Sequence, residues 1–202
     1  MPAAERPVIS LVEPTLAGLS AYCDALARGW SPDSERDASA ERLTALLLDP
    51  KAFLRDITGR DPTIRLDDGR IVARLPTRAF WIWDGAFGGT INLRYRPGSE
   101  ELPDWISGHI GYTVVPWRRR RGYATRALAL ILPVAAASGM RRVLITCDTD
   151  NEPSRRVIEA NGGIFAYTTP HPWVSGKTKL CYWVPTGAEA ALETEPMRDG
   201  MT

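Results

Sequence analysis

The sequence lacks a surplus of either charge, which argues against one large class of function. It has 25 basic and 24 acidic residues, for a formal net charge of +1. A protein dedicated to binding nucleic acid usually carries a clear basic excess. We therefore expect no nucleic acid among its partners, and read its run of four arginines, residues 118–121, as a local feature of a neutral protein.

Cysteines and long apolar runs are also scarce. Cys23, Cys147 and Cys181 are far apart and odd in number, which suits neither a disulfide framework nor the paired spacing of a zinc site and indicates a reducing compartment. No stretch approaches the roughly 20 apolar residues of a membrane span, and the first ten residues lack the apolar core of a secretion signal. We expect a cytoplasmic protein with no metal and no membrane partner.

The length of 202 residues, 44% of them hydrophobic, suits one domain with a real core. We place that domain at residues 1–185. Residues 186–202 form a polar tail that we expect to be poorly ordered.

The first 80 residues have strand and helix signals. A short β-branched run at 7–14 predicts a first strand, and the apolar spacing after Pro14 predicts a helix. A second helix is expected over 39–57, broken or ended by Pro50. Residues 58–78, rich in Asp, Gly and Arg, are expected to form a loop.

The remainder alternates strands and helices. Three β-rich runs at 79–84, 88–95 and 108–115 predict an antiparallel meander. A helix from Gly122 should be kinked or ended early by Pro133. Further elements are predicted as a strand at 141–148, a helix over 152–163 with a glycine stop, and two closing strands near 164–169 and 179–185. This order predicts an α+β fold around one central sheet.

The stretch VVPWRRRRGYATRAL (114–128) has the composition of an anion site. A strand, a short turn and a helix starting near Gly122 would leave the backbone N–H groups of residues 120–125 without helical partners. The helix dipole adds partial positive charge there. Gly122 has no side chain to block a ligand, and Ala124 keeps the next turn small. Neither a P-loop nor a dinucleotide fingerprint fits the spacing.

The spacing resembles the acyl-CoA signature of the GNAT superfamily of acetyl-CoA-dependent N-acetyltransferases, V-x-x-x-x-Q/R-x-x-G-x-G/A. Val114, Arg119, Gly122 and Ala124 match it. Downstream, Asn151 and Ser154 match the family's N-x-x-A/S pattern, and the meander lies where the family's strands two to four would be. The resemblance covers residues 81–167 well and residues 7–80 loosely.

The resemblance implies a GNAT-like single domain with a mixed, mostly antiparallel central sheet flanked by helices and splayed between strands four and five. Acetyl-CoA would enter the splay as cosubstrate, with no metal. Its expected binding residues are Tyr112, Thr113, Val114, Arg119, Arg120, Arg121, Gly122, Tyr123, Ala124, Thr125, Asn151 and Ser154. For Asn151, a helix N-cap is an equally good interpretation.

Direct attack of an amine on the thioester needs a base, an oxyanion donor and an acid for the thiolate. Many relatives supply the acid from a tyrosine seven residues after the asparagine, but Ile158 stands there. His109 on the fourth strand is a candidate base, with a buried strand histidine as the alternative. Tyr167 and Tyr112 are candidate donors, or packing residues. Cys147, mid-strand and without an evident histidine partner, is a weak nucleophile candidate, and ordered water is a further candidate base.

Three functions stay open from the sequence. The first is N-acetylation of a primary amine on a small molecule or peptide. The second is a GNAT-fold module that binds acyl-CoA without turnover, and the presence of Ile158 in place of the helix tyrosine is consistent with it. The third, nucleic-acid binding through Arg118–Arg121, is disfavoured by the net charge. A homodimer through exposed sheet edges is a further expectation.

Overall fold

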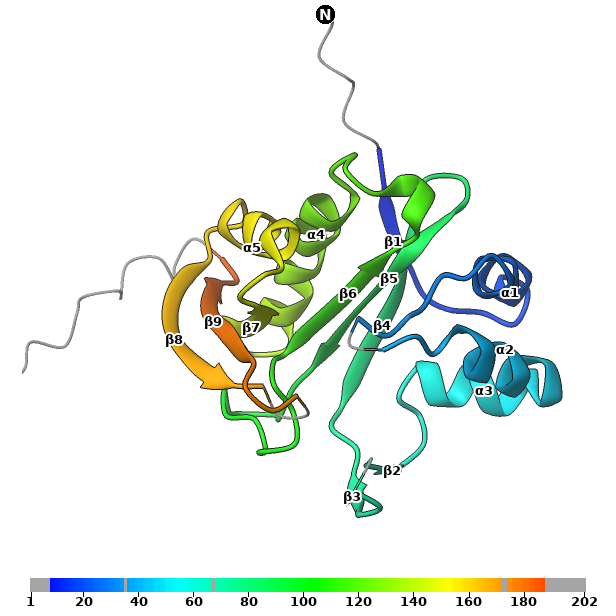
Figure 1. Cartoon of the computed structure of the whole chain (residues 1–202), viewed down its shortest axis with the longest axis horizontal. Helices are drawn as coiled ribbons and strands as arrows, with labels where there is room; N and C mark the ends of the chain where they lie inside the picture. Colours follow the sequence, from blue (N-terminus) through cyan, green and yellow to red (C-terminus); the bar gives the residue numbers. More distant parts are fainter. Residues whose placement is uncertain (1–7, 35, 67, 172–173, 188–202) are drawn as a thin grey trace, which may run out of the picture.

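The strands form two main sheets that adjoin at β6 and β7 (Figure 1). The computed structural model describes residues 8–34, 36–66, 68–171 and 174–187. The first sheet is antiparallel and has the order β1 (Ser10–Val12), β4 (Thr77–Trp83), β5 (Phe87–Arg94), β6 (Ile110–Val114). The second is also antiparallel, with the order β7 (Arg142–Asp148), β9 (Thr178–Pro185), β8 (Ile164–Pro170). The predicted α+β fold and its splay between the fourth and fifth core strands are confirmed.

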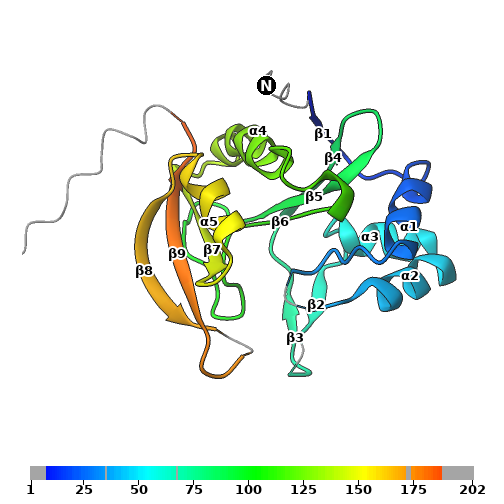
Figure 2. The same ribbon diagram turned by 45° about the horizontal axis from the view of Figure 1, so that its top comes forward.

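Helices cover both faces of the first sheet (Figures 1 and 2). One face carries α1 (Leu19–Ala27), α2 (Ser39–Leu48) and α3 (Pro50–Ile57). The opposite face carries α4 (Tyr123–Ala137), and α5 (Glu152–Glu159) packs beside α4 on β7 of the second sheet. None of the helices in the described ranges is both long and apolar enough to cross a membrane.

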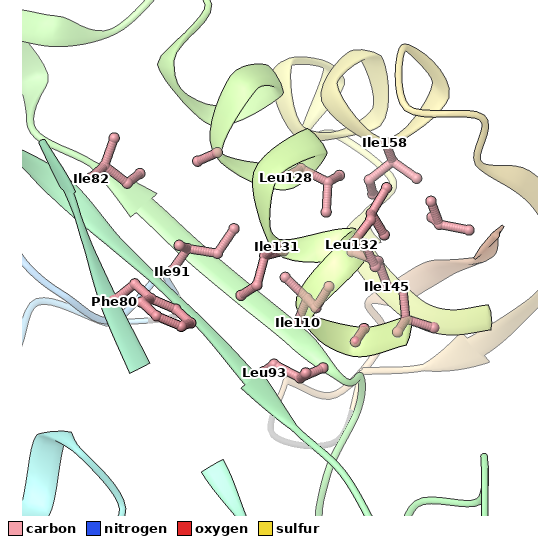
Figure 3. Close-up of a cluster of buried hydrophobic side chains, with 14 of the residues drawn as sticks. Phe80, Ile82, Ile91, Leu93, Ile110, Leu128, Ile131, Leu132, Ile145 and Ile158 are labelled. Atoms are coloured by element: carbon pink, nitrogen blue, oxygen red, sulfur yellow. The ribbon is translucent and has the colours of Figure 1, made fainter. Parts of the chain in front are cut away.

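The alternation of side chains along β4 assigns each face its own core. Phe80 and Ile82 lie on the side of the sheet that α4 covers, where they join Ile91, Leu93 and further buried residues (Figure 3). Trp81 and Trp83 point the other way, into a second cluster beneath α1–α3. Successive side chains of a strand face opposite sides of its sheet, so the two tryptophans are explained by packing.

Pro50 separates two helices, as predicted. It occupies the first turn of α3, and the side chain of Asp49 caps that helix by accepting from the N–H groups of Lys51 and Ala52 at 3.0 and 2.9 Å. Proline is tolerated in a first turn because its missing N–H would have no helical partner there.

One expectation is wrong, and one of the two alternatives for Pro133 is excluded. Residues 58–78 contain a hairpin of β2 (Thr63–Arg65) and β3 (Ile71–Ala73), whose three-residue, mostly exposed strands show no clear periodicity. Pro133 does not end its helix early, because α4 continues to Ala137. Ile131 and Ala135 are fully buried on either side of this proline, and their packing outweighs the loss of one backbone hydrogen bond. The predicted tail lies mostly outside the described residues.

Candidate active site

The turn between β6 and α4 presents a row of free backbone amides. After a short 3₁₀ helix (Pro116–Arg118), Arg120 and Gly122 both have positive φ, 59° and 81°. Within the described structure, none of the N–H groups of residues 120–125 donates to a backbone carbonyl, and the first helical bond of α4 runs from Arg126 to Gly122. Successive amides turned inward by such angles form an anion-binding concavity at a helix N-terminus. A Cβ on Gly122 would meet no atom within 4 Å, so this concavity is open.

Two of the four arginines hold this loop in place. Arg118 Nη1 lies 2.6 Å from the carboxylate of Asp84 and 2.9 Å from the hydroxyl of Tyr123, which itself donates to Asp84. Arg119 Nε donates to the carbonyl of Val114 at 3.0 Å. Arg120 and Arg121 are exposed. Within the run, Arg118 and Arg119 therefore stabilise the loop through hydrogen bonds, whereas Arg120 and Arg121 present their charges to solvent.

The splay between β6 and β7 begins at His109. The N–H of His109 donates to the carbonyl of Leu144 at 2.8 Å, and the N–H of Leu144 donates to His109 Nδ1, also at 2.8 Å. Nδ1 of the imidazole thus accepts the hydrogen bond that a backbone carbonyl of the neighbouring strand would otherwise accept from Leu144. Beyond this point β6 is the edge of its sheet, so its outer edge is available to a ligand.

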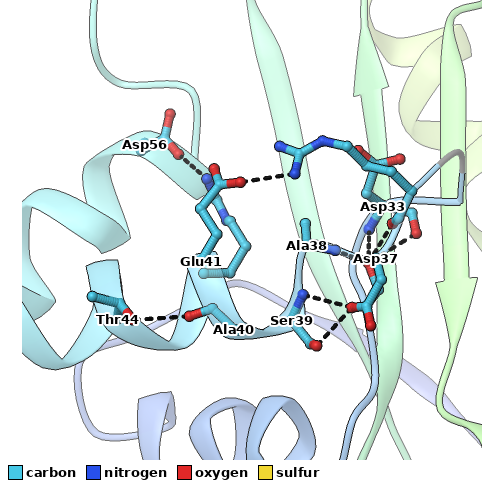
Figure 4. A network of polar contacts seen from close by, with 11 residues as sticks. Asp33, Asp37, Ala38, Ser39, Ala40, Glu41, Thr44 and Asp56 are labelled. Atoms are coloured by element: carbon cyan, nitrogen blue, oxygen red, sulfur yellow. Dashed lines mark hydrogen bonds and ion pairs between the residues drawn. The ribbon is translucent and has the colours of Figure 1, made fainter.

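A cleft of about 610 Å³ opens where the strands part and continues under the segment that joins α1 to α2. Its walls include Trp81, Asn92, Arg94, Tyr112 and Thr146. The opposite wall carries an ion-pair network, in which Arg36 Nη1 contacts Glu41 at 2.7 Å (Figure 4). The described residues contain no group of three or more His, Cys, Asp or Glu side chains that could hold a metal ion.

Tyr112 bridges β6 and α5. Its hydroxyl lies 2.8 Å from Ser154 Oγ, and burial raises its pKa to about 12, against the opposing effect of that hydrogen bond. Asn151 caps α5, because its Oδ1 accepts from the N–H of Ser154 at 3.1 Å. Ile158, where relatives of the suspected family would have tyrosine, is fully buried in the core. Because Ser154 and Ile158 are four residues apart, they share one face of the helix.

The three candidates for chemistry lie in different settings. His109 is fully buried, and burial together with the nearby charge of Arg94 lowers its pKa to about 4. This setting favours the structural alternative. Tyr167 is half exposed on β8 and lines a separate hollow of about 450 Å³ with Trp105 and Trp183. Cys147 is buried, and its pKa is raised to about 11, chiefly by burial, which disfavours a thiolate nucleophile.

Two cleft residues were missed by the sequence reasoning. Arg94 ends β5 and reaches the cleft floor. His171 lies between β8 and β9 with its Nε2 3.6 Å from Asp148 Oδ1. Neither belongs to a motif, and only the tertiary fold brings His171 to the cleft. Arg94 had one available signal: it continues the alternation of Thr90 and Asn92, opposite the apolar Ile91 and Leu93.

Comparison with known proteins identifies the family. The model of the acetyltransferase (GNAT) domain matches residues 32–164. The chain therefore belongs to the GNAT acetyltransferase family. None of the curated proteins matches the chain significantly.

Solved structures share the fold. RimJ of Mycobacterium smegmatis, in complex with CoA-disulfide, has 19% identity over 89% of this chain and 83% of its own, with a TM-score of 0.63. The Microcin C7 self-immunity acetyltransferase MccE, in complex with acetyl-CoA and AMP, has 11% identity over 90% and 97%, with a TM-score of 0.58. An acetyltransferase from Salmonella typhimurium that modifies the N-terminal serine of ribosomal protein L7/L12 has 14% identity over 88% and 94%, with a TM-score of 0.59.

Proposed function

We propose that the protein transfers an acetyl group from acetyl-CoA to a primary amine by direct attack. The observation that carries this proposal is the run of free amides at residues 120–125, at the end of a strand whose outer edge pairs with no other described strand. Backbone amides of this kind donate hydrogen bonds to the oxygens of a pyrophosphate. An unpaired strand edge offers backbone hydrogen bonds to the amides of a pantetheine arm. Structural neighbours hold CoA or acetyl-CoA.

In this proposal the loop before α4 and the edge of β6 bind different parts of the cosubstrate. The amides of residues 120–125 bind the pyrophosphate, while Arg120 and Arg121 present their charges to the phosphates. The backbone of Tyr112, Thr113 and Val114 pairs with the pantetheine arm. Asn151 uses its Oδ1 for the cap, which leaves its Nδ2 to donate to that arm.

Tyr112 is our candidate for the thiolate acid, in preference to Tyr167. Its hydroxyl meets Ser154 on the same face of α5 as Ile158, so it approaches the helix surface that the family's tyrosine would occupy. With a pKa of about 12 it keeps its proton at neutral pH. The amine nitrogen bonds to the acetyl carbon as the carbon–sulfur bond breaks, and a backbone N–H near Val114 stabilises the oxyanion. The sulfur then takes the tyrosine proton, the proton of the amine passes to water in the cleft, and that water returns a proton to Tyr112, so that the tyrosine is restored.

The amine class includes small molecules and peptide or protein N-termini. One structural neighbour is described as a ribosomal L7/L12 alpha-N-protein acetyltransferase. The described cysteines are free thiols, in keeping with the cytoplasmic location that we propose. A homodimer contact would best be placed at edge strand β8, where Ile164 and Phe165 are exposed.

A second candidate is a module that binds acyl-CoA without turnover, favoured by the isoleucine at position 158. The test is release of CoA thiol from acetyl-CoA, corrected for hydrolysis, across a panel of amines. Steady acetylated product with any amine supports the enzyme. Tight CoA binding by calorimetry with no product from any amine would favour the binding module.

A further inference from the structure

Arg94 brings a positive charge to the floor of the cleft. It lies on the same face of β5 as Thr90 and Asn92, while Ile91 and Leu93 face the core. The backbone N–H of Arg94 donates to the carbonyl of His109. Its side chain therefore starts beside the point where β6 and β7 separate.

Among the described residues, no acidic side chain forms an ion pair with Arg94. Arg36 pairs with Asp33 and Glu41, and Arg42 and Arg74 share Asp56. The guanidinium of Arg94 forms no hydrogen bond or ion pair with a described residue, and its Nε is buried. Burial also lowers its pKa, and nearby His109 is held neutral. Arg94 is partly buried overall, and of its nitrogens only Nε is both buried and unpaired. Because the residue lines the cleft and no described acidic side chain neutralises its charge, the guanidinium is available to a negative group from outside.

The side chains of Arg94 and Asn92 lie close to the backbone of β6 because residue 111 is glycine. A Cβ at Gly111 would lie 3.3 Å from Arg94 Nη2 and 3.7 Å from Asn92 Oδ1. Asn92 Oδ1 is itself buried without a partner among the described residues. A cationic donor and an amide acceptor thus border the same side of Gly111. This pairing suits a ligand that carries both a carboxylate and an N–H group.

We infer that the acceptor is a carboxylate-bearing amine, an amino acid or short peptide, whose carboxylate is bound by Arg94. This inference rests on the proposed function. Gly111 precedes Thr113 and Val114 by two and three residues, or about 7–10 Å along the strand. The carboxylate and the attacking amine are therefore separated by the length of two or three residues of extended chain, so a dipeptide is the shortest peptide that spans them through its α-amine.

The first experiment needs no turnover. We would titrate N-acetylated dipeptides and their C-terminal amides into the CoA-loaded protein by calorimetry. The wild type should bind the acids about 10- to 100-fold more tightly than the amides, as expected for charge-assisted hydrogen bonds. Arg94→Gln should remove this preference. Equal binding of acid and amide by the wild type would overturn the inference, whether or not the protein proves to be an enzyme.

The second experiment measures kcat/KM for matched acceptors. Dipeptides, their amides, and amides with Asp or Asn at the second position separate a C-terminal carboxylate from a side-chain carboxylate. Preference for either acid over its neutral counterpart supports the inference. Acetylation of acids and amides at equal rates would refute it while leaving the proposed function standing.

Three further variants test whether the role of Arg94 is purely structural. Arg94→Lys keeps the charge without the planar fork and should retain part of the preference. Arg78→Gln, on neighbouring strand β4, is the matched control, because Arg78 pairs with exposed Glu13; its preference should be unchanged. Arg94→Met should unfold no more easily than wild type, since it removes an unpaired charge. A large loss of stability in Arg94→Met, with acids and amides affected equally, would show that Arg94 serves packing alone.

Discussion

Replacing Gly122 with valine tests the anion loop without touching the core. Gly122 has φ 81° and precedes the first residue of α4. A Cβ there meets no protein atom within 4 Å, so the branched side chain would project into the space where we place the pyrophosphate. The variant should fold but bind CoA poorly.

The magnitudes of the two effects can be separated. A non-glycine residue in this left-handed conformation costs about 1–2 kcal/mol. Blocking two charge-assisted hydrogen bonds to a pyrophosphate costs about 3–6 kcal/mol, or more than about 100-fold in Kd. Gly139 is a matched control at the other end of the same helix, with φ 84° and also no atom within 4 Å of a Cβ. Gly139→Val should lose similar stability and no affinity.

The assay is calorimetric titration with CoA, together with urea unfolding of both variants. We expect the unfolding free energies of the two variants to fall by similar amounts, and only Gly122→Val to lose affinity. Unchanged CoA affinity in Gly122→Val would remove the pyrophosphate from this loop. An equal loss of affinity in Gly139→Val would attribute the effect to the stability of α4.

Two more predictions concern proton chemistry. Tyr112→Phe should lower single-turnover acetyl transfer about 100-fold or more, as for loss of a general acid, and leave CoA affinity within a few-fold; unchanged transfer would contradict its role. For His109, the unfolded chain takes up a proton near pH 6.5, whereas the folded protein does so only near pH 4. The free energy of unfolding should therefore fall by up to about 3 kcal/mol as the pH drops through that window, and His109→Gln should flatten this slope in urea titrations. If His109→Gln instead removes a limb from the pH profile of kcat/KM, His109 is the base.

Local signals were enough to predict most of the fold. The break at Pro50, the meander and the glycine stop after α5 each follow from side chains whose effect is confined to a few neighbours. Pro133 marks the limit of such reasoning, because buried residues on both sides of it belong to a core assembled from distant strands. The β2–β3 hairpin escaped detection because its short strands bury too little to create a periodic pattern.

The open turn before α4 was predictable for the same reason, since its glycine and its helix are contiguous in sequence, and its role in binding CoA stays a prediction. The acceptor side was not. Arg94 stands out because its side chain pairs with none of the residues that the structure describes, and no sequence pattern records such a feature. His171 reaches the cleft only because β8 and β9 fold back along β7. The role of His109 depends on its register with Leu144, 35 residues later in the chain.

The arginine run has a consequence for how this protein can vary. Arg118 reaches both a carboxylate and a phenol with one nitrogen, and Arg119 donates through Nε, an atom that lysine lacks. Lysine at position 119 would lack this Nε donor, and lysine at position 118 would end one bond short of the position that Arg118 Nη1 occupies. At positions 120 and 121 only charge and reach matter, so lysine would serve as well. The four arginines therefore differ in how they tolerate substitution. Replacement by lysine is expected to be neutral at positions 120 and 121 and costly at positions 118 and 119.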